Sequence, residues 1–398
     1  MAAPSAPLHV LLLCQNIGSI ECNTKEVSTA NQEMTLQWTR SVADFLKREE
    51  ERFHAAVDVL VIHLQEIGGK KFNGAFNDYL RTVMPRCYPE AAWCSGLMGP
   101  AQDDATTFTA MGSILFLSQR VVNLASIWSF EKKRFVSISN WNNHEAKDGF
   151  YASSKFSNAG TSRKGYLLTT LRIGESRPIN FVNLHLLHDA DNSIAASQPH
   201  PSEYVLKRAE AMAETISAAP FSGSQDPIFL FGDFNLRLDT HSLKRILEDK
   251  FQQVIQLEKK KVLASDGVWE FLQDSQNWPI LRALDKDAGF IQNYCRDKTG
   301  FGLHESPLEF GPTYLLEDDP AKCILNSAND GIDKSNGVHG NDPALTACYK
   351  RHSRFLAWAD RIWFNEAGKD LLKEKNVAYW TSSLHTMDHL PVYLRFSL

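Results

Sequence analysis

The sequence lacks the cysteine patterns of a disulfide-built or zinc-built protein. Seven cysteines in 398 residues include no CxxC pair and no cysteine/histidine spacing typical of a metal site. We therefore expect reduced thiols and a cytoplasmic location. The cysteines are Cys14, Cys22, Cys87, Cys94, Cys295, Cys323 and Cys348.

Long hydrophobic runs are also missing. No apolar stretch approaches the roughly 20 residues that a membrane-spanning helix needs. The run Leu8–Cys14 is short, has no basic segment before it and no small-residue cleavage pattern after it, which favours a buried strand over a signal peptide. The last residues, 395–398, contain no cysteine for prenylation. We expect no membrane anchor.

Strong charge, internal repeats and flexible linkers are absent as well. A net charge of -5 argues against binding nucleic acid by neutralising many phosphates. With no repeat and no Gly/Ser linker, residues 8–398 are expected to form a single catalytic domain after a disordered lead-in over 1–7. The stretch 316–347, with its Gly, Asn, Asp and Ser clusters, predicts a long loop or insertion.

Apolar runs of strand length recur over the whole chain, and they are apolar enough to be buried on both faces. Helical patterns lie between some of them, around Leu36–Leu46 and Tyr204–Ile216. These features predict an α/β fold, a four-layer α/β/β/α sandwich of two packed mixed sheets with outer helices. The expected strands are Leu8–Cys14, Val57–Leu64, Ser113–Leu117, Tyr166–Ile173, Ile179–Leu186, Pro227–Phe231, Arg361–Phe364 and Val392–Phe396.

Several of these runs end or begin at similar polar residues. Asn16 follows the first strand, Glu66 follows the second, and His185 lies at the end of another. Gly232-Asp233-Phe234-Asn235 closes a fourth run, while the pairs Asp360-Arg361 and Asp388-His389 stand at the start of the last two. Because ligand sites in α/β sheets gather at strand ends, these side chains are expected to converge.

The residue types fit phosphoester hydrolysis assisted by a hard cation. Magnesium prefers a few oxygen ligands, which Glu66 and Asn16 would supply. Attack by water needs a base, an orienting group and positive charge around phosphorus, and Asp233, Asn235 and the two histidines provide them. Asp360 is a candidate partner for His389.

Each residue also has a structural interpretation. Asn16 or Glu66 alone is an ordinary turn or capping residue, the Gly232–Asn235 segment alone is a turn, and His185 alone is a core histidine. The joint occurrence of all of them in strand context favours a site.

These motifs resemble those of the inositol polyphosphate 5-phosphatases, a branch of the endonuclease/exonuclease/phosphatase superfamily. The segment Gly232-Asp233-Phe234-Asn235-Leu236-Arg237 looks like the family's Gly-Asp-x-Asn-x-Arg motif, and Ala357-Trp358-Ala359-Asp360-Arg361-Ile362 looks like its Pro-x-Trp-Cys-Asp-Arg signature. Segments 65–70, 162–166 and 183–189 are similar to the type I enzymes, which act on soluble inositol 1,4,5-trisphosphate and 1,3,4,5-tetrakisphosphate.

The resemblance implies magnesium-dependent removal of the 5-phosphate from such inositol polyphosphates, which would end inositol trisphosphate and calcium signalling. Asn16 and Glu66 would hold Mg²⁺, Asp233 would activate water positioned by Asn235, and His185 and His389 would meet the scissile phosphate. Asp360 and Asp388 join the catalytic set. Arg163, Lys164 and Arg361 would bind substrate.

Three positions depart from the family pattern: Ala359 replaces cysteine, Leu356 replaces proline, and Leu390 replaces the lysine after Asp388-His389. The missing lysine charge is expected to weaken phosphate binding or shift specificity. Lys350, Arg351 and Arg354 could compensate, although a solvated loop is the favoured interpretation of that run.

Three alternatives stay open at the level of sequence. A phosphoinositide lipid phosphatase shares the catalytic parts, but no polybasic segment beside an anchor supports it. A nuclease fits the acidic net charge poorly. A catalytically weak inositol-phosphate-binding module is favoured only by Leu390.

Overall fold

The computed structural model describes residues 7–18, 28–67, 109–138, 150–218, 225–317, 349–373, 377–381 and 387–398, together with the backbone of 91–94. The expected lead-in over 1–7 therefore lies outside the described residues except for its last position. Nearly all of the predicted loop over 316–347 also lies outside them.

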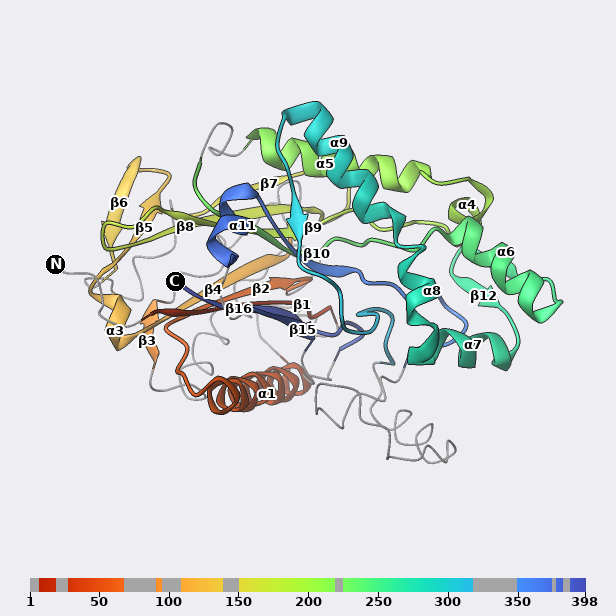
Figure 1. The fold of residues 1–398 in the computed structure, drawn as a ribbon, viewed down its shortest axis with the longest axis horizontal. Helices are drawn as coiled ribbons and strands as arrows, with labels where there is room; N and C mark the ends of the chain where they lie inside the picture. Colours follow the sequence, from red (N-terminus) through yellow and green to blue (C-terminus); the bar gives the residue numbers. More distant parts are fainter. Residues whose placement is uncertain are drawn as a thin grey trace.

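Two mixed β-sheets pack face to face (Figure 1). The first has six strands, and the second has eight. In order across the first sheet they are β15 (Ala378–Thr381), β16 (Val392–Ser397), β1 (His9–Asn16), β2 (Val59–Gln65), β4 (Met111–Ser118) and β3 (Ala91–Cys94). Across the second they are β13 (His304–Glu305), β14 (Asp360–Phe364), β10 (Ile228–Asp233), β9 (Ile179–His185), β8 (Gly165–Ile173), β5 (Ala125–Ser129) and β6 (Arg134–Ser137), with β7 (Ala152–Lys155) also paired to β8.

Helices cover the outer faces of the two sheets (Figure 1). Helix α1 (Thr29–Phe53) lies on the first sheet, whereas α5 (Glu203–Ala218) and α9 (Lys286–Thr299) pack together over the second. The predicted four-layer arrangement is therefore confirmed. The remaining elements are α3 (Gln119–Val122), α4 (Asn192–Ser197), α6 (Thr240–Phe251), the hairpin strands β11 (Gln256–Glu258) and β12 (Lys261–Leu263), α7 (Asp266–Gln273), a 3-10 turn (Ser275–Asn277), α8 (Trp278–Arg282) and α11 (Glu366–Leu372).

Alternation along β1 shows how the layers form. Val10, Leu12 and Cys14 face the core between the two sheets, whereas Leu11 and Leu13 face the core under α1. Successive side chains of a strand point to opposite faces, so a strand buried on both sides reads as one continuous apolar run. All eight strands expected from such runs are present.

The elements between β10 and β14 have no counterpart among the helices and strands expected from the sequence. This part of the chain holds α6 to α9, the β11–β12 hairpin and β13, and α6, α7, α8 and β12 lie together at one end of the sandwich, on the right in Figure 1. In the described part of the chain Cys14 and Cys295 are free and buried thiols. None of the helices within the described ranges combines the length and apolarity that crossing a bilayer requires.

Gly232 is a point of close approach within β10. It has a φ of +152°, and a Cβ atom there would lie 2.1 Å from the carbonyl oxygen of Leu184 on β9. A side chain at this position would push the two strands apart immediately before Asp233.

We predict that Gly232→Ala lowers the free energy of unfolding by about 3 kcal/mol or more, because the strand pair must separate to admit the methyl group. Urea denaturation measures the loss. Gly174→Ala is the matched control: Gly174 also has a positive φ, +57°, but an added Cβ would meet no atom within 4 Å, so a cost of only about 1 kcal/mol is expected. Equal losses in the two variants would contradict the prediction.

Candidate active site

Strand direction brings the predicted site residues to one edge of the sandwich. Strands β1 and β2 are parallel, and their register pairs Asn16 with Gln65, one residue before Glu66. Strands β9 and β10 are also parallel and pair His185 with Asp233, while the antiparallel β14 pairs Asp233 with Asp360. The convergence expected from the sequence is thus produced by backbone pairing.

The Asp233 carboxylate is the centre of this edge. It is 1% exposed and accepts hydrogen bonds from the side-chain amide of Asn16 (3.0 Å), the backbone N–H of Asn235 (2.8 Å) and the side-chain amide of Asn235 (3.0 Å). Burial alone would raise the pKa of Asp233, but the charge of His389 and the contacts with His185 and Lys164 hold it well below its usual value. Asp233 is therefore a carboxylate at neutral pH.

Glu66 and Asn16 present oxygen atoms to a common space. A Cβ added to Gly18 would lie 2.7 Å from Oε2 of Glu66 and 3.2 Å from Oδ1 of Asn16, so the glycine leaves the space between these oxygens open. The side-chain amide of Asn16 donates to Asp233, and its oxygen accepts the backbone N–H of Gly18 at 3.0 Å, so both ends of the side chain are held. A carboxylate and an amide oxygen around an open space fit a hard divalent cation.

Three basic side chains surround Glu66. Its carboxylate lies 3.8 Å from the amine of Lys164, 3.8 Å from the guanidinium of Arg163 and 3.6 Å from Nε2 of His185. Burial opposes ionisation of Glu66, but these neighbours outweigh it and lower its pKa. Lys164 also makes a very short contact with Nε2 of His185. Arg163 and Lys164, two of the three residues predicted to bind substrate, thus lie beside Glu66.

His389 forms the ion pair with Asp360 that the sequence suggested. Nδ1 of His389 lies 2.9 Å from Oδ2 of Asp360, and the hydroxyl of Thr313 donates to the same oxygen at 2.8 Å. Burial alone would lower the pKa of His389, but the carboxylates of Asp360 and Asp233 raise it to about 10. The imidazole is therefore positively charged at neutral pH.

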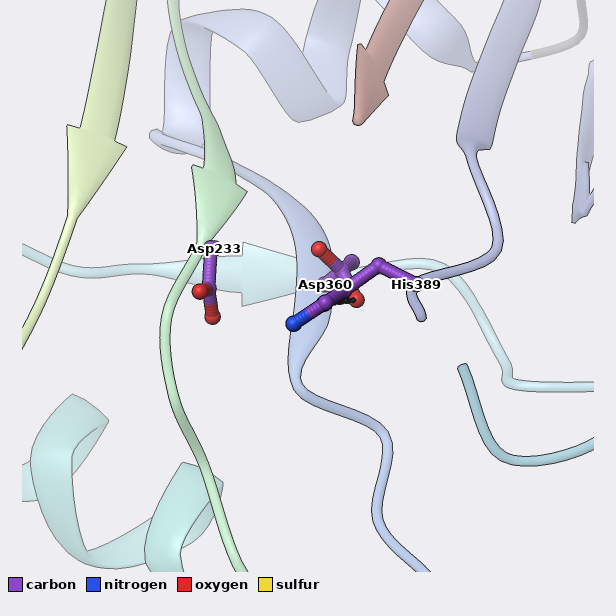
Figure 2. Close-up of side chains that lie close together, drawn as sticks. All are labelled: Asp233, Asp360 and His389. Carbon is purple, nitrogen blue, oxygen red and sulfur yellow. Dashed lines mark hydrogen bonds and ion pairs between the residues drawn. The ribbon is translucent and has the colours of Figure 1, made fainter. Parts of the chain in front are cut away.

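Asp233, Asp360 and His389 come from three separate segments and lie side by side (Figure 2). One ligand atom from each lies within 4.8 Å of the others, a spacing that would suit a metal ion. Nδ1 of His389 is already paired with Oδ2 of Asp360, however, and Oδ2 of Asp233 already accepts the amide of Asn16. The assignment of the Glu66–Asn16 pair as the metal position stays a prediction.

A second basic region adjoins the centre. Arg237 donates to the side-chain oxygen of Asn235 at 2.9 Å, and its guanidinium stacks 4.3 Å from the ring centre of Tyr314. Its Nε and Nη1 atoms are buried and have no partner in the described structure. Arg237 and Arg354 line a small hollow together with Asp189. Burial and the neighbouring Arg237 lower the pKa of Arg354, a sign of crowded positive charge.

Reasoning from the sequence misses this hollow, although signals for it exist. Arg237 belongs to the Gly-Asp-x-Asn-x-Arg motif, but the motif alone assigns it no role. The interpretation of Arg354 as part of a solvated loop is wrong, because its guanidinium donates to the carbonyl of Asp189 at 2.8 Å and lines the hollow. Nothing in the sequence points to Tyr314, whose ring lies 4.5 Å from that of His389.

Arg361 does not reach the site. It follows Asp360 in β14 and so points to the opposite face, where it is fully buried. Its guanidinium pairs with Asp285 and, at 3.0 Å, with Glu305. The expectation that Arg361 binds substrate is therefore corrected: its donors already serve two buried carboxylates.

Asp388 and Leu390 flank His389 without joining the three-residue group. The charge of Asp388 contributes to the raised pKa of His389. The side chain of Leu390 is 2% exposed and packs in the core between the sheets. The effect of the missing lysine charge on phosphate binding therefore stays a prediction.

Comparison with known proteins places this site in a family. The model of the endonuclease/exonuclease/phosphatase family 2 matches residues 22–395, and the chain belongs to that family. A probable type I inositol 1,4,5-trisphosphate 5-phosphatase of Caenorhabditis elegans is 24% identical, over 98% of this chain and 100% of its own. Human inositol polyphosphate-5-phosphatase A is 25% identical, over 100% of this chain and 94% of its own.

A solved structure agrees at the level of fold. The inositol polyphosphate 5-phosphatase domain of SPsynaptojanin, crystallised with inositol (1,4)-bisphosphate and a calcium ion, superposes with a TM-score of 0.50 at 14% identity, covering 98% of this chain and 84% of that domain. Together with the relatives, it confirms the resemblance to the inositol polyphosphate 5-phosphatases seen in the sequence.

We predict that Asp360→Asn lowers the pKa of His389 from about 10 towards its usual value. Burial lowers this pKa, and without the charge of Asp360 the main group that still raises it is Asp233. Turnover should fall by about 100-fold at neutral pH as the positive charge is lost. Titration of the imidazole by nuclear magnetic resonance measures the first effect. Thr313→Val is the control and should give a smaller shift, because it removes the hydroxyl that donates to the Asp360 carboxylate and accepts the Asp360 backbone N–H but leaves the carboxylate in place.

The same pair sets a pH dependence of stability. The pKa of His389 is higher in the folded chain than the value of about 6.5 in an unfolded chain. The ion pair therefore contributes its full stabilisation of the fold at pH values below about 6.5. This contribution is lost as the pH rises through about 10. Asp360→Asn should remove this alkaline decline, and a variant that keeps both the decline and the high pKa would contradict the assignment.

Proposed function

We propose that the chain is a magnesium-dependent phosphatase that removes the 5-phosphate of soluble inositol polyphosphates. The observation that carries the proposal is the juxtaposition of two groups of side chains. One is a hydrolytic centre around Asp233, and the other is the basic hollow lined by Arg237 and Arg354. A substrate with two or more phosphates on one ring would use both.

The hydrolytic centre has the charges that attack by water requires. Asp233, ionised and held by Asn16 and Asn235, would orient the water and accept its proton, and the negative phosphate would raise its low pKa on arrival. His389, charged by its contact with Asp360, would stabilise the oxygens of the phosphoryl group.

Two further groups would complete the phosphate site. Burial and the charge of Lys164 lower the pKa of His185, so this imidazole would act as a neutral hydrogen-bonding group. Glu66 and Asn16 would hold Mg²⁺, which when bound would neutralise charge on the phosphate. The synaptojanin domain, crystallised with inositol bisphosphate and a calcium ion, is consistent with this chemistry.

The basic hollow supports a polyphosphate rather than a simple phosphate ester. Arginine binds phosphate with paired donors, and the buried unpaired donors of Arg237 are costly unless an anion engages them. Tyr314 lies between this guanidinium and His389 and so would separate the scissile phosphate from its neighbour.

We predict that Asp233→Asn reduces kcat by at least about 1,000-fold, because the neutral amide cannot take the proton of the attacking water. Release of inorganic phosphate from inositol 1,4,5-trisphosphate measures it. Chelating divalent metal should abolish turnover of the unaltered protein, and adding Mg²⁺ should restore it. Undiminished turnover in Asp233→Asn would contradict the proposed role of Asp233.

The choice of substrate is tested with a panel of defined inositol phosphates and with the lipid counterpart in vesicles. Loss of the 5-phosphate from the soluble tris- and tetrakisphosphates is expected. Turnover confined to the lipid would reject the soluble substrate, and ligand binding without any release of phosphate would reject the enzyme.

We further predict that Arg354→Ala or Arg237→Ala raises KM for the trisphosphate about 10-fold or more, because a charge-assisted phosphate contact is lost. A substrate that lacks the neighbouring phosphate should show no such penalty. Arg296→Ala is the control, since Arg296 is an exposed arginine on α9. Equal effects on both substrates would show that the hollow does not bind the second phosphate.

A further inference from the structure

A buried arginine of α5 lies behind the basic hollow. Arg208 is 0% exposed, and its guanidinium donates to the carboxylates of Asp189 (2.6 Å) and Asp287 (2.7 Å) and to the carbonyl of Leu187 (3.2 Å). Asp189 and Leu187 belong to the loop after β9, whereas Asp287 lies in the first turn of α9. Arg208 thus connects three elements of the fold.

Both carboxylates that Arg208 neutralises are next to the arginines of the hollow. Asp189 lines the hollow with Arg237 and Arg354, and its backbone carbonyl accepts the hydrogen bond from Arg354. Asp287 accepts the backbone N–H of Arg237 at 3.0 Å on the oxygen that also meets Arg208. His200 lies 3.3 Å from the other oxygen of Asp287.

The arrangement has an electrostatic consequence. An unpaired carboxylate in this position would attract Arg237 or Arg354 and would repel an incoming phosphate. Occupied by Arg208, the same carboxylates act as anchors, since they hold the backbone of Arg237 and the loop whose carbonyl holds Arg354. The donors of Arg237 are left for a ligand.

We propose that Arg208 is a positioning residue for phosphate binding, which sequesters the Asp189 and Asp287 carboxylates and thereby keeps Arg237 and Arg354 available to the substrate. This inference rests on the proposed function for the identity of the ligand. It goes beyond that function because Arg208 is fully buried and would act through the carboxylates it binds.

The test is a double-mutant cycle on Arg208 and Asp189. Binding of inositol 1,4,5-trisphosphate is measured by calorimetry in the presence of a chelator, and kcat and KM are measured separately with Mg²⁺. Arg208→Met should raise Kd and KM by at least about 10-fold, because the freed carboxylate competes with phosphate for the arginines. The effect on kcat should be much smaller.

Adding Asp189→Asn to Arg208→Met should restore most of the binding, because the competing charge is removed, and Asp189→Asn alone is measured to complete the cycle. A merely structural role for Arg208 predicts no such rescue. If Arg208→Met does not fold, Arg208→Lys provides the second route, because one ammonium group cannot hold both carboxylates in the geometry of the guanidinium.

Arg395→Met is the matched control for loss of a buried arginine. Arg395 is 1% exposed and holds the carbonyls of Glu49 and Ala55 beside α1, in the other sheet. This variant should lose stability without losing affinity. An unchanged Kd in Arg208→Met, or no rescue by Asp189→Asn, overturns the inference. Failure of the proposed function would appear separately, as absent turnover in the unaltered protein.

Discussion

The site depends on a polar bridge that fixes the two sheets to each other at one edge. The side-chain amide of Asn183 on β9 donates to the backbone carbonyls of Leu64 (3.1 Å) and Gly112 (2.7 Å) in the other sheet, and its oxygen accepts from Gln65 at 2.7 Å. Apolar packing between sheets is not directional, whereas these buried hydrogen bonds are. Asn183 precedes His185 by two residues and Gln65 directly precedes Glu66, so the bridge sets how Glu66 in one sheet faces His185 in the other.

Charge balance is the second constraint on this edge. Asp233, Asp360, His389 and Lys164 are all buried, and a buried charge is costly unless it is paired and hydrogen-bonded. Each has a partner from another strand or loop, as in the pair of His389 with Asp360. Beneath the hollow, Arg208 compensates Asp189 and Asp287 in the same way. The centre therefore carries fixed charges before any substrate arrives, which is the preorganisation that electrostatic catalysis requires.

Much of the fold and part of the site are predictable from the sequence. Strands such as β1 and β10 are continuous apolar runs because both of their faces are buried, and polar residues at their ends mark the site. The pairing of His389 with Asp360 also follows. The expectation for Arg361 fails because a residue one position along a strand points to the other face, and no spacing rule reveals which face holds the substrate. The positions of Tyr314 and Arg354 at the site are not predictable from the sequence, because they depend on how loops far apart in the chain pack together. Arg354, for example, donates to the carbonyl of Asp189.

Two of the three positions where this chain departs from the family signatures share a structural property. Ala359 is fully buried, and its carbonyl accepts the backbone N–H of Phe234 at 2.8 Å, next to Asp233. Leu390 has its side chain in the core, while its own N–H donates to the carbonyl of Thr313 at 2.8 Å, next to the hydroxyl that binds Asp360. At both positions the backbone makes the contact that holds a neighbouring site residue, and any side chain that fits the core leaves that contact intact. Ala359 and Leu390 therefore keep the backbone contacts beside Asp233 and Asp360, whereas the third departure, Leu356, lines the hollow with Arg237 and Arg354.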